Sequence, residues 1–163
     1  MIRSIVAIDS RRGLADDGGI PWRGRLPTDA QYFRDQTREG ALVMGFRTYE
    51  EFSRPLHQPP NYVWGRPGPP LRPGFEPTGD LDVFLHHHGS EGVWIIGGTG
   101  LYAQSLGSVD ELFVTRIDRD FHCTKFFPEF EGQFTLASAS DPQTEHGIAF
   151  QFEVWRRSTG SVG

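Results

Sequence analysis

Short apolar runs recur along the chain between longer polar or amphipathic stretches. Residues 2–8 (IRSIVAI), 41–45 (ALVMG) and 93–97 (VWIIG) are rich in aliphatic and β-branched side chains, which is typical of strands buried on both faces. The runs 61–65 (NYVWG) and 110–118 (DELFVTRID) predict two further strands. Because segments of helical length separate several of these strands, the pattern indicates an α/β fold with a mostly parallel sheet.

Helices are predicted in four of the intervening segments: 27–40, 47–53, 80–88 and 99–106. In the first of them, Pro27 suits the first helical position, and Thr28 and Gln31 have the spacing of a capping box. Gly40 is expected to end that helix. The prolines between residues 54 and 79 exclude a central helix there.

The end of the chain alternates between apolar and polar residues over 134–140 and 148–157, which predicts an antiparallel hairpin. The complete prediction is therefore one α/β domain over residues 1–157. It has a mostly parallel central sheet, an antiparallel C-terminal edge hairpin and helices on both faces. Residues 158–163 are expected to form a flexible tail.

A long polar, glycine-rich loop is predicted over residues 9–25, directly after the first strand. Loops of this length inside a compact domain are usually functional. Ile20, Pro21 and Trp22 lie in its middle, and such an apolar tip needs a surface on which to pack.

Composition narrows the classes of protein to consider. The 163 residues suffice for one domain, and a net charge of −5 argues against non-specific nucleic-acid binding. The sequence has no run of 18 apolar residues, so no membrane span is predicted, and the first residues have no signal-peptide pattern. The single cysteine, Cys123, excludes an internal disulfide, so a reducing cytoplasm is the expected location. We interpret Cys123 as structural.

Parallel α/β sheets bind ligands at the carboxyl ends of their strands, so candidate sites are expected in the segments that follow the predicted strands. Asp29, in the first turn of a helix, could pair with the amidine-like edge of a heterocycle or merely stabilise the helix end. Residues 97–100 (GGTG) could contact a diphosphate or simply form a turn that needs glycine. Gly45, Arg47 and Thr48 offer a second phosphate contact, with a solvated first helical turn as the alternative.

Six motifs together resemble the dihydrofolate reductase family. They are Pro21-Trp22, Leu26 to Asp29 (LPTD), Met44 to Tyr49 (MGFRTY), Ile96 to Tyr102 (IGGTGLY), Asp110 to Asp118 and Thr124 to Pro128 (TKFFP). Their order and spacing match the family over nearly the whole chain, from residue 1 to about residue 157. The resemblance implies reduction of 7,8-dihydrofolate to tetrahydrofolate with NADPH.

The resemblance also implies roles for individual residues. Asp29 would bind N3 and the 2-amino group of the pterin, Thr115 would support that carboxylate, and Trp22 would hold a water beside it. Residues 9–25 would be a mobile lid, and the Gly97–Gly98 peptide bond would be cis. The further substrate-binding residues would be Ile5, Val6, Ala7, Ala30, Phe33, Phe52, Leu56, Ile96 and Tyr102. The cofactor-binding residues would be Ala7, Leu14, Ile20, Gly45, Phe46, Arg47, Thr48, Arg66, Ile96, Gly97, Gly98, Thr99, Gly100, Leu101 and Tyr102.

Two positions depart from the family pattern. Pro59 lies where the family has an arginine that pairs with the glutamate α-carboxylate of folate, and a proline cannot make that contact. Arg34 or Arg54 is expected to replace it. Phe46 and Gly100 lie where basic residues usually bind the adenosine 2′-phosphate. Arg66, with Arg47 as the second candidate, is expected to take that role, which favours NADPH over NADH.

Three further expectations complete the interpretation. The alternative function is a pterin or pyrimidine reductase of the same fold, acting on a substrate without a glutamate tail. The protein is expected to act as a monomer on a small molecule, without nucleic-acid or membrane partners. His86, His87 and His88 are consecutive and point in different directions on a helix, so no metal site is expected.

Overall fold

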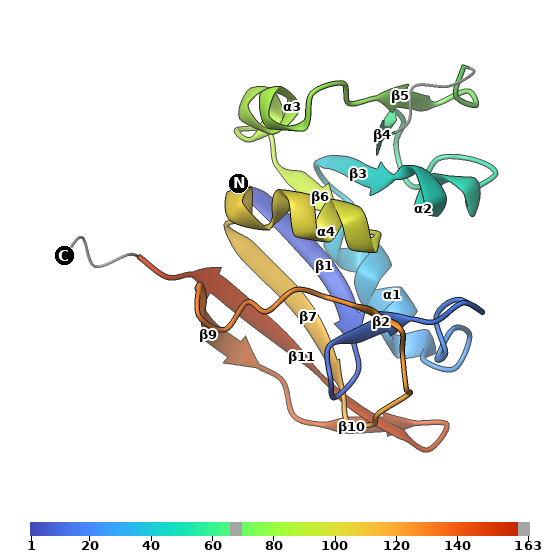
Figure 1. The fold of residues 1–163 in the computed structure, drawn as a ribbon, viewed down its shortest axis with the longest axis vertical. Coiled ribbons are helices and arrows are strands. Elements are labelled where there is room, and N and C mark those ends of the chain that lie inside the picture. Colours follow the sequence, from blue (N-terminus) through green and yellow to red (C-terminus); the bar gives the residue numbers. More distant parts are fainter. Residues whose placement is uncertain (66–69, 160–163) are drawn as a thin grey trace.

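The computed structural model describes residues 1–65 and 70–159, and its centre is a mixed β-sheet (Figure 1). The sheet order is β10-β11-β7-β1-β6-β3-β4-β5, and β9 pairs with another part of β11. The strands from β7 to β5 are mutually parallel, whereas β9, β10 and β11 are antiparallel to their partners. Their bounds are β1 Ile2–Ile8, β3 Ala41–Gly45, β4 Asn61–Trp64, β5 Phe75–Pro77, β6 Val93–Ile95, β7 Glu111–Ile117, β9 Phe134–Ala139, β10 Gln143–Glu145 and β11 Ile148–Arg157. This arrangement confirms the predicted α/β class with an antiparallel C-terminal edge.

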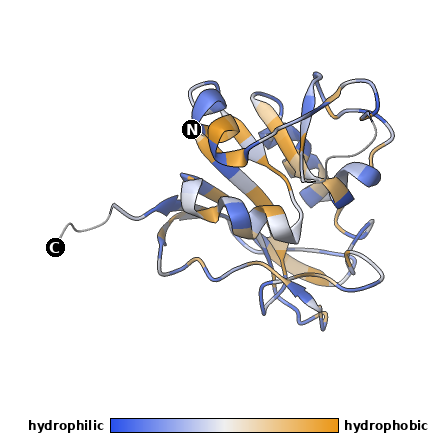
Figure 2. Ribbon diagram, turned by 45° about the horizontal axis from the view of Figure 1, so that its top comes forward, coloured by the Kyte–Doolittle hydropathy of each residue, from blue (hydrophilic) through white to orange (hydrophobic). Residues whose placement is uncertain are grey.

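Helices cover the two faces of the sheet. They are α1 Pro27–Gln36, α2 Phe46–Glu50, α3 Leu81–His88 and α4 Thr99–Ser105, with the 3-10 turn η1 Leu106–Ser108 after α4. Side chains alternate along β1, so Val6 and Ile8 pack in the cluster that contains α3 and α4 residues. Ile5, next to Val6, packs on the opposite face in a cluster that α1 contributes to. Figure 2 shows apolar residues concentrated along the central strands and the helices against them.

Aromatic side chains from the segment after β7 close one face of the sheet. Phe127 and Phe130 are buried there, and the ring of Phe127 contacts that of Tyr102 on α4 edge-on, with centroids 5.1 Å apart. Fully burying one such side chain stabilises the fold by roughly 1.5–3 kcal/mol. The loop that carries them is therefore held against α4.

The start and end of α1 differ from the prediction. The capping box is wrong: the backbone N–H and Oγ1 of Thr28 both donate to the carboxylate of Glu145, at 3.0 and 2.6 Å. This acceptor comes from β10, so only the tertiary fold could supply it. Helix α1 ends at Gln36, not Gly40. Gly40 instead occupies a turn at φ +102°, where a Cβ atom would lie 3.0 Å from the carbonyl oxygen of Gly92.

Four short strands were not predicted. The loop 9–25 contains β2 (Gly13–Ala15), which pairs with β8 (Lys125–Phe126). Strand β5 ends in a proline at the sheet edge, where a missing backbone donor is tolerated, and β10 forms the tight hairpin with β11. Each is two or three residues long, so it depends on its partner strand and has too few residues to show a pattern of its own.

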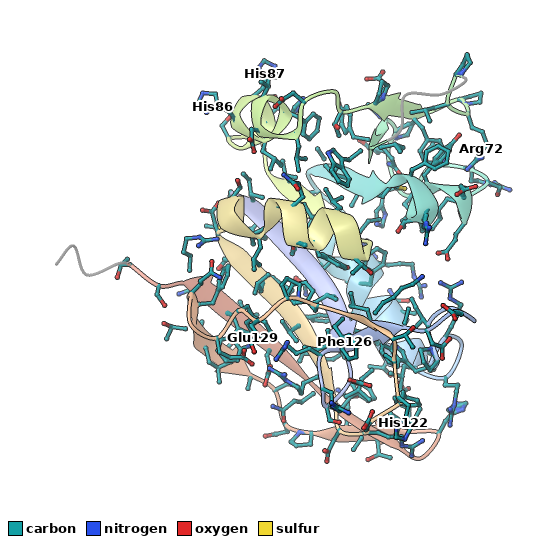
Figure 3. All side chains as sticks on the ribbon, viewed as in Figure 1. Arg72, His86, His87, His122, Phe126 and Glu129 are labelled. Atoms are coloured by element: carbon teal, nitrogen blue, oxygen red, sulfur yellow. The ribbon has the colours of Figure 1, made fainter. Side chains whose placement is uncertain are left out.

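Residues near the two ends of the second described range, 70–159, make defined contacts with the rest of the fold. Arg72 lies just after the first gap; it stacks on the Tyr49 ring and donates to the carbonyl oxygens of Tyr49 and Phe52 behind α2 (Figure 3). Near the C-terminal end, the Ser158 N–H donates to the Gln133 carbonyl oxygen. Within the two described ranges, no helix is long and apolar enough to cross a membrane.

Candidate active site

A cavity of about 1290 Å³ opens at the carboxyl ends of β1, β3 and β6, as expected for an open parallel sheet. The sheet, α1, α2, α4 and the loop 9–25 all contribute to its walls. Its volume exceeds the roughly 300–1,000 Å³ typical of a pocket for one drug-sized ligand. The cavity therefore has room for two ligands side by side.

The cavity brings together nearly all residues that the sequence predicted for a site. All three predicted catalytic residues, Asp29, Trp22 and Thr115, line it. The predicted substrate and cofactor residues that line it are Ile5, Val6, Ala7, Leu14, Ile20, Ala30, Phe33, Arg34, Gly45, Phe46, Arg47, Thr48, Phe52, Leu56, Ile96, Gly97, Gly98, Thr99, Gly100, Leu101 and Tyr102. Arg54 is exposed and is not among the lining residues. Arg66 lies outside the described residues.

Asp29 and Thr115 form the polar centre of this cavity. Asp29 is in the first turn of α1, while Thr115 is buried on β7 and donates its Oγ1 hydrogen to Asp29 Oδ1 at 2.6 Å. Burial raises the pKa of the Asp29 carboxyl; the Thr115 hydrogen bond lowers it and the nearby Glu145 charge raises it further. Carboxyls whose pKa values are raised in this way are candidates for proton donors.

The base of the cavity beside α4 is built from glycines. The Gly97–Gly98 peptide bond is cis, as the resemblance implies, and Gly97 has a φ of +126°. The Gly45 N–H donates to the Gly97 carbonyl oxygen at 2.6 Å. A Cβ atom at Gly45 would lie 3.4 Å from the Gly98 nitrogen, so the two backbone segments approach closely at the cavity wall. The side chain of Thr48 lies directly beside this turn: its Oγ1 would be 3.5 Å from a Cβ atom placed on Gly98.

Asp9 anchors the loop 9–25 and was not singled out from the sequence. Its fully buried carboxylate accepts the N–H groups of Arg11 (2.9 Å), Gly13 (2.7 Å) and Phe121 (3.0 Å). Burial alone would raise the pKa of Asp9, but these hydrogen bonds outweigh it, so the pKa lies below its ordinary value. An aspartate two residues before a polar turn is an Asx-turn signal, although the third bond is formed by a residue 112 positions away.

Trp22 and Cys123 lie in one apolar cluster under the same loop. Trp22 is buried, and its ring lies against that of Phe121 with centroids 5.3 Å apart. Cys123 is also buried, and its burial together with the charge and hydrogen bond of Asp9 raises the pKa of the thiol to about 11. A thiol in this state is a poor nucleophile at neutral pH, which agrees with the structural interpretation of this residue.

The surroundings of Pro59 concern the position where the family has its arginine. His57, two residues before Pro59, has its Nε2 3.0 Å from Thr37 Oγ1. Arg34 lines the cavity and donates to Gln31 on its own helix at 2.9 Å. Of the two arginines proposed to replace the missing one, only Arg34 therefore faces the cavity.

Sequence reasoning missed several other lining residues, including Glu51, Trp64 and Lys125. Arg23 forms an ion pair with Glu51 at 3.2 Å, whereas Trp64 lies at the end of β4. An apolar strand that ends beside a candidate phosphate site was the available signal for Trp64. Lys125 belongs to β8, a strand that local pattern did not reveal.

The histidine run lies away from this cavity, on α3. Figure 3 shows His86 and His87 projecting from the outer side of that helix, and His88 stacks on Phe84. Among residues 1–65 and 70–159, no three His, Cys, Asp or Glu side chains are grouped closely enough to hold a metal ion.

The fold and cavity define an open α/β sheet protein with a cavity across the carboxyl ends of its strands. The sequence profile of the dihydrofolate reductase family matches residues 1–157. The chain is 31% identical over 155 residues to a dihydrofolate reductase of Bacillus subtilis, covering 94% of this chain and 91% of the relative. It is 32% identical over 183 residues to the Gallus gallus dihydrofolate reductase, covering 96% of both. This chain belongs to the dihydrofolate reductase family.

Proposed function

We propose that this protein reduces 7,8-dihydrofolate to 5,6,7,8-tetrahydrofolate with NADPH. The observation that carries the proposal is the Asp29–Thr115 pair, a carboxyl of raised pKa in a cavity wide enough for two ligands. NADPH, when bound, supplies the hydride for C6 of the pterin. The protein's own task is to bind and orient both molecules, exclude water and deliver a proton to N5.

Asp29 is the residue to which we assign pterin binding and protonation. Its carboxylate can accept two parallel hydrogen bonds from N3 and the 2-amino group, an arrangement that fixes the ring in its plane. Thr115 donates to one carboxylate oxygen at 2.6 Å, and both oxygens keep a lone pair for the ligand. Because burial raises the pKa of Asp29, a proton near the substrate costs less there than at an exposed aspartate.

Apolar side chains would hold the rings on either side of this pair. Phe33 on α1 and Leu56 would sandwich the pterin and aminobenzoyl rings, with Ile5 as a wall at the sheet. Trp22, a buried residue of the loop 9–25, would position a water near the carboxyl. The loop 9–25, held at its base by Asp9, would cover the reacting atoms and exclude bulk water.

The described residues fit a nicotinamide dinucleotide. The close approach of Gly45 to the Gly97–Gly98 turn leaves backbone, free of side chains, along the wall beside Thr48. Arg47 lines the same wall and is the described candidate for the 2′-phosphate, while Arg66 remains the sequence-based candidate. This set favours NADPH over NADH.

One observation favours the alternative, a pterin or pyrimidine reductase whose substrate lacks a glutamate tail. Pro59 cannot pair with a carboxylate, and Arg54 does not line the cavity. Arg34 is the one proposed substitute that does.

Loss of NADPH absorbance, measured with dihydrofolate, with a dihydropterin lacking the tail and with no substrate, tests both functions. Turnover of dihydrofolate, abolished in Asp29→Asn, is the expected result. Equal kcat/KM for both substrates would favour the alternative, and no turnover of either would refute both. A single species at the monomer mass in light scattering is expected.

A further inference from the structure

Lys125 is the one lysine of the chain, and its side chain lines the active-site cavity. It lies in β8, next to the loop that covers the site, and its register partner on β2 is Ala15. Side chains alternate along an extended segment, so Lys125 and Phe127 share one side and Phe126 the other. Phe127 packs on Tyr102 of α4, whereas Phe126 is exposed (Figure 3). The alternation therefore directs Lys125 inward, toward the wall formed by α4.

The ammonium group of Lys125 has no ion-pair partner in the described structure. Of the cations that line the cavity, Arg23 pairs with Glu51, and Arg34 is bonded to Gln31 at the α1 end. Among the described residues that line the cavity, Arg47 on α2 and Lys125 on β8 are the two cations that remain. Lysine side chains bury their aliphatic stems and keep the ammonium in solvent, so this partly buried residue has its charge available to an anionic ligand.

We propose that Lys125 is a cofactor-binding residue that contacts the diphosphate of the bound dinucleotide, an inference that rests on the proposed function. The cavity wall beside it contains Leu14 and Ala15 at one end and the Gly97–Gly98 turn at the other. A dinucleotide bound along this wall would place its charged diphosphate between the two ends. Lysine suits this role because it is a compact point charge on a flexible stem, and a phosphate oxygen is its ordinary partner.

The position of this charge explains how an acidic protein holds a polyanionic ligand. The chain has a net charge of −5. Phe46 and Gly100, which line the cavity where the phosphate groups would bind, are uncharged. The loop residues Asp16 and Asp17 add two carboxylates to the same cavity. Lys125 on β8 supplies local positive charge from outside the two segments that contain Gly45 and Gly97–Gly98.

Affinity measurements on Lys125→Met test the proposal. We expect the Kd for NADPH, measured by quenching of tryptophan fluorescence at low salt, to rise about 10-fold, since a charge-assisted contact is lost. The Kd for NADH should rise by a similar factor, because both cofactors have the diphosphate. Lys125→Arg should retain most of the affinity. Arg38→Met, which removes the same charge from an exposed residue paired with Asp35, is the matched control and should bind normally.

The uniqueness of the lysine allows a second measurement on the intact protein. Reductive methylation with ¹³C-formaldehyde labels only Lys125 and the amino group of Met1, which donates to the Gly89 carbonyl oxygen outside the cavity. NADPH should shift the Lys125 methyl resonance and leave that of Met1 in place, whereas dihydrofolate alone should shift neither. Wild-type protein that fails to bind NADPH would refute the proposed function. Normal NADPH binding with unchanged affinity in Lys125→Met, or a shift caused by dihydrofolate alone, would overturn the assignment of Lys125.

Discussion

Replacing Asp29 by asparagine changes the chemistry of the site with almost no change in shape. The amide side chain introduced by Asp29→Asn keeps an oxygen that can accept the Thr115 hydroxyl, which now lies 2.6 Å from Oδ1. It cannot make two charge-assisted hydrogen bonds to the pterin edge, each worth about 1.5–3 kcal/mol. The substitution also removes a proton donor worth about 10²–10⁴-fold. Together these losses predict a kcat/KM at least about 10³-fold lower, which corresponds to about 4 kcal/mol.

The same substitution has an opposite effect on stability. Because burial raises the pKa of Asp29, the folded state binds its proton more tightly than the unfolded state does. The stability that Asp29 contributes is therefore complete below its unfolded pKa of about 4 and is lost as pH rises through its folded pKa. We therefore expect the free energy of unfolding of Asp29→Asn, measured in urea and relative to that of wild type, to be higher at pH 8 than at pH 4.

Steady-state rates across pH and urea unfolding at pH 4 and pH 8 measure both effects. Wild-type turnover should fall as pH rises through an apparent pKa above that of a free aspartate. Asp35→Asn, an exposed residue of the same helix, is the matched control and should alter neither property. Near-normal turnover of Asp29→Asn at pH 7 would refute the assigned role, and a stability difference that does not grow with pH would refute the electrostatic reasoning.

Three further predictions concern the loop and the rim of the cavity. Asp9→Asn should lower the free energy of unfolding at pH 7 by about 1.5–3 kcal/mol, because its buried charge accepts three N–H bonds, including that of Phe121. Since the pKa of Asp9 is lowered in the fold, this loss should shrink as pH falls below about 4, and urea unfolding at both pH values checks it. Cys123, with a thiol pKa of about 11, should react slowly with a disulfide reagent at pH 8 until the protein is unfolded. Arg34→Ala should raise KM for dihydrofolate but not for a tailless dihydropterin, with Arg54→Ala as the control; equal effects of both variants would contradict the placement of Arg34 at the tail.

Local sequence pattern was enough to predict the parallel centre of the fold, whereas most residues of the cavity were predicted from the resemblance to the dihydrofolate reductase family. The apolar runs at 2–8, 41–45 and 93–97 form β1, β3 and β6, because strands buried on both faces need aliphatic side chains along their whole length. Asp29 lies in the first turn of α1, after β1 and the loop 9–25, and Gly97–Gly98 comes just after β6. Their meeting at one edge follows from the parallel order of the strands, so it could be predicted.

The contacts that join distant segments became visible only in the folded chain. Glu145 accepts hydrogen bonds from the start of α1, and Asp9 accepts one from a backbone N–H 112 residues away. Neither pair of partners can be recognised from a local sequence pattern. The pairing of β2 with β8 brings Lys125 to the cavity, although β8 is only two residues long. Such short strands and single polar contacts have little propensity of their own. Their positions depend on which surfaces the packed core brings together, and a linear sequence does not state this.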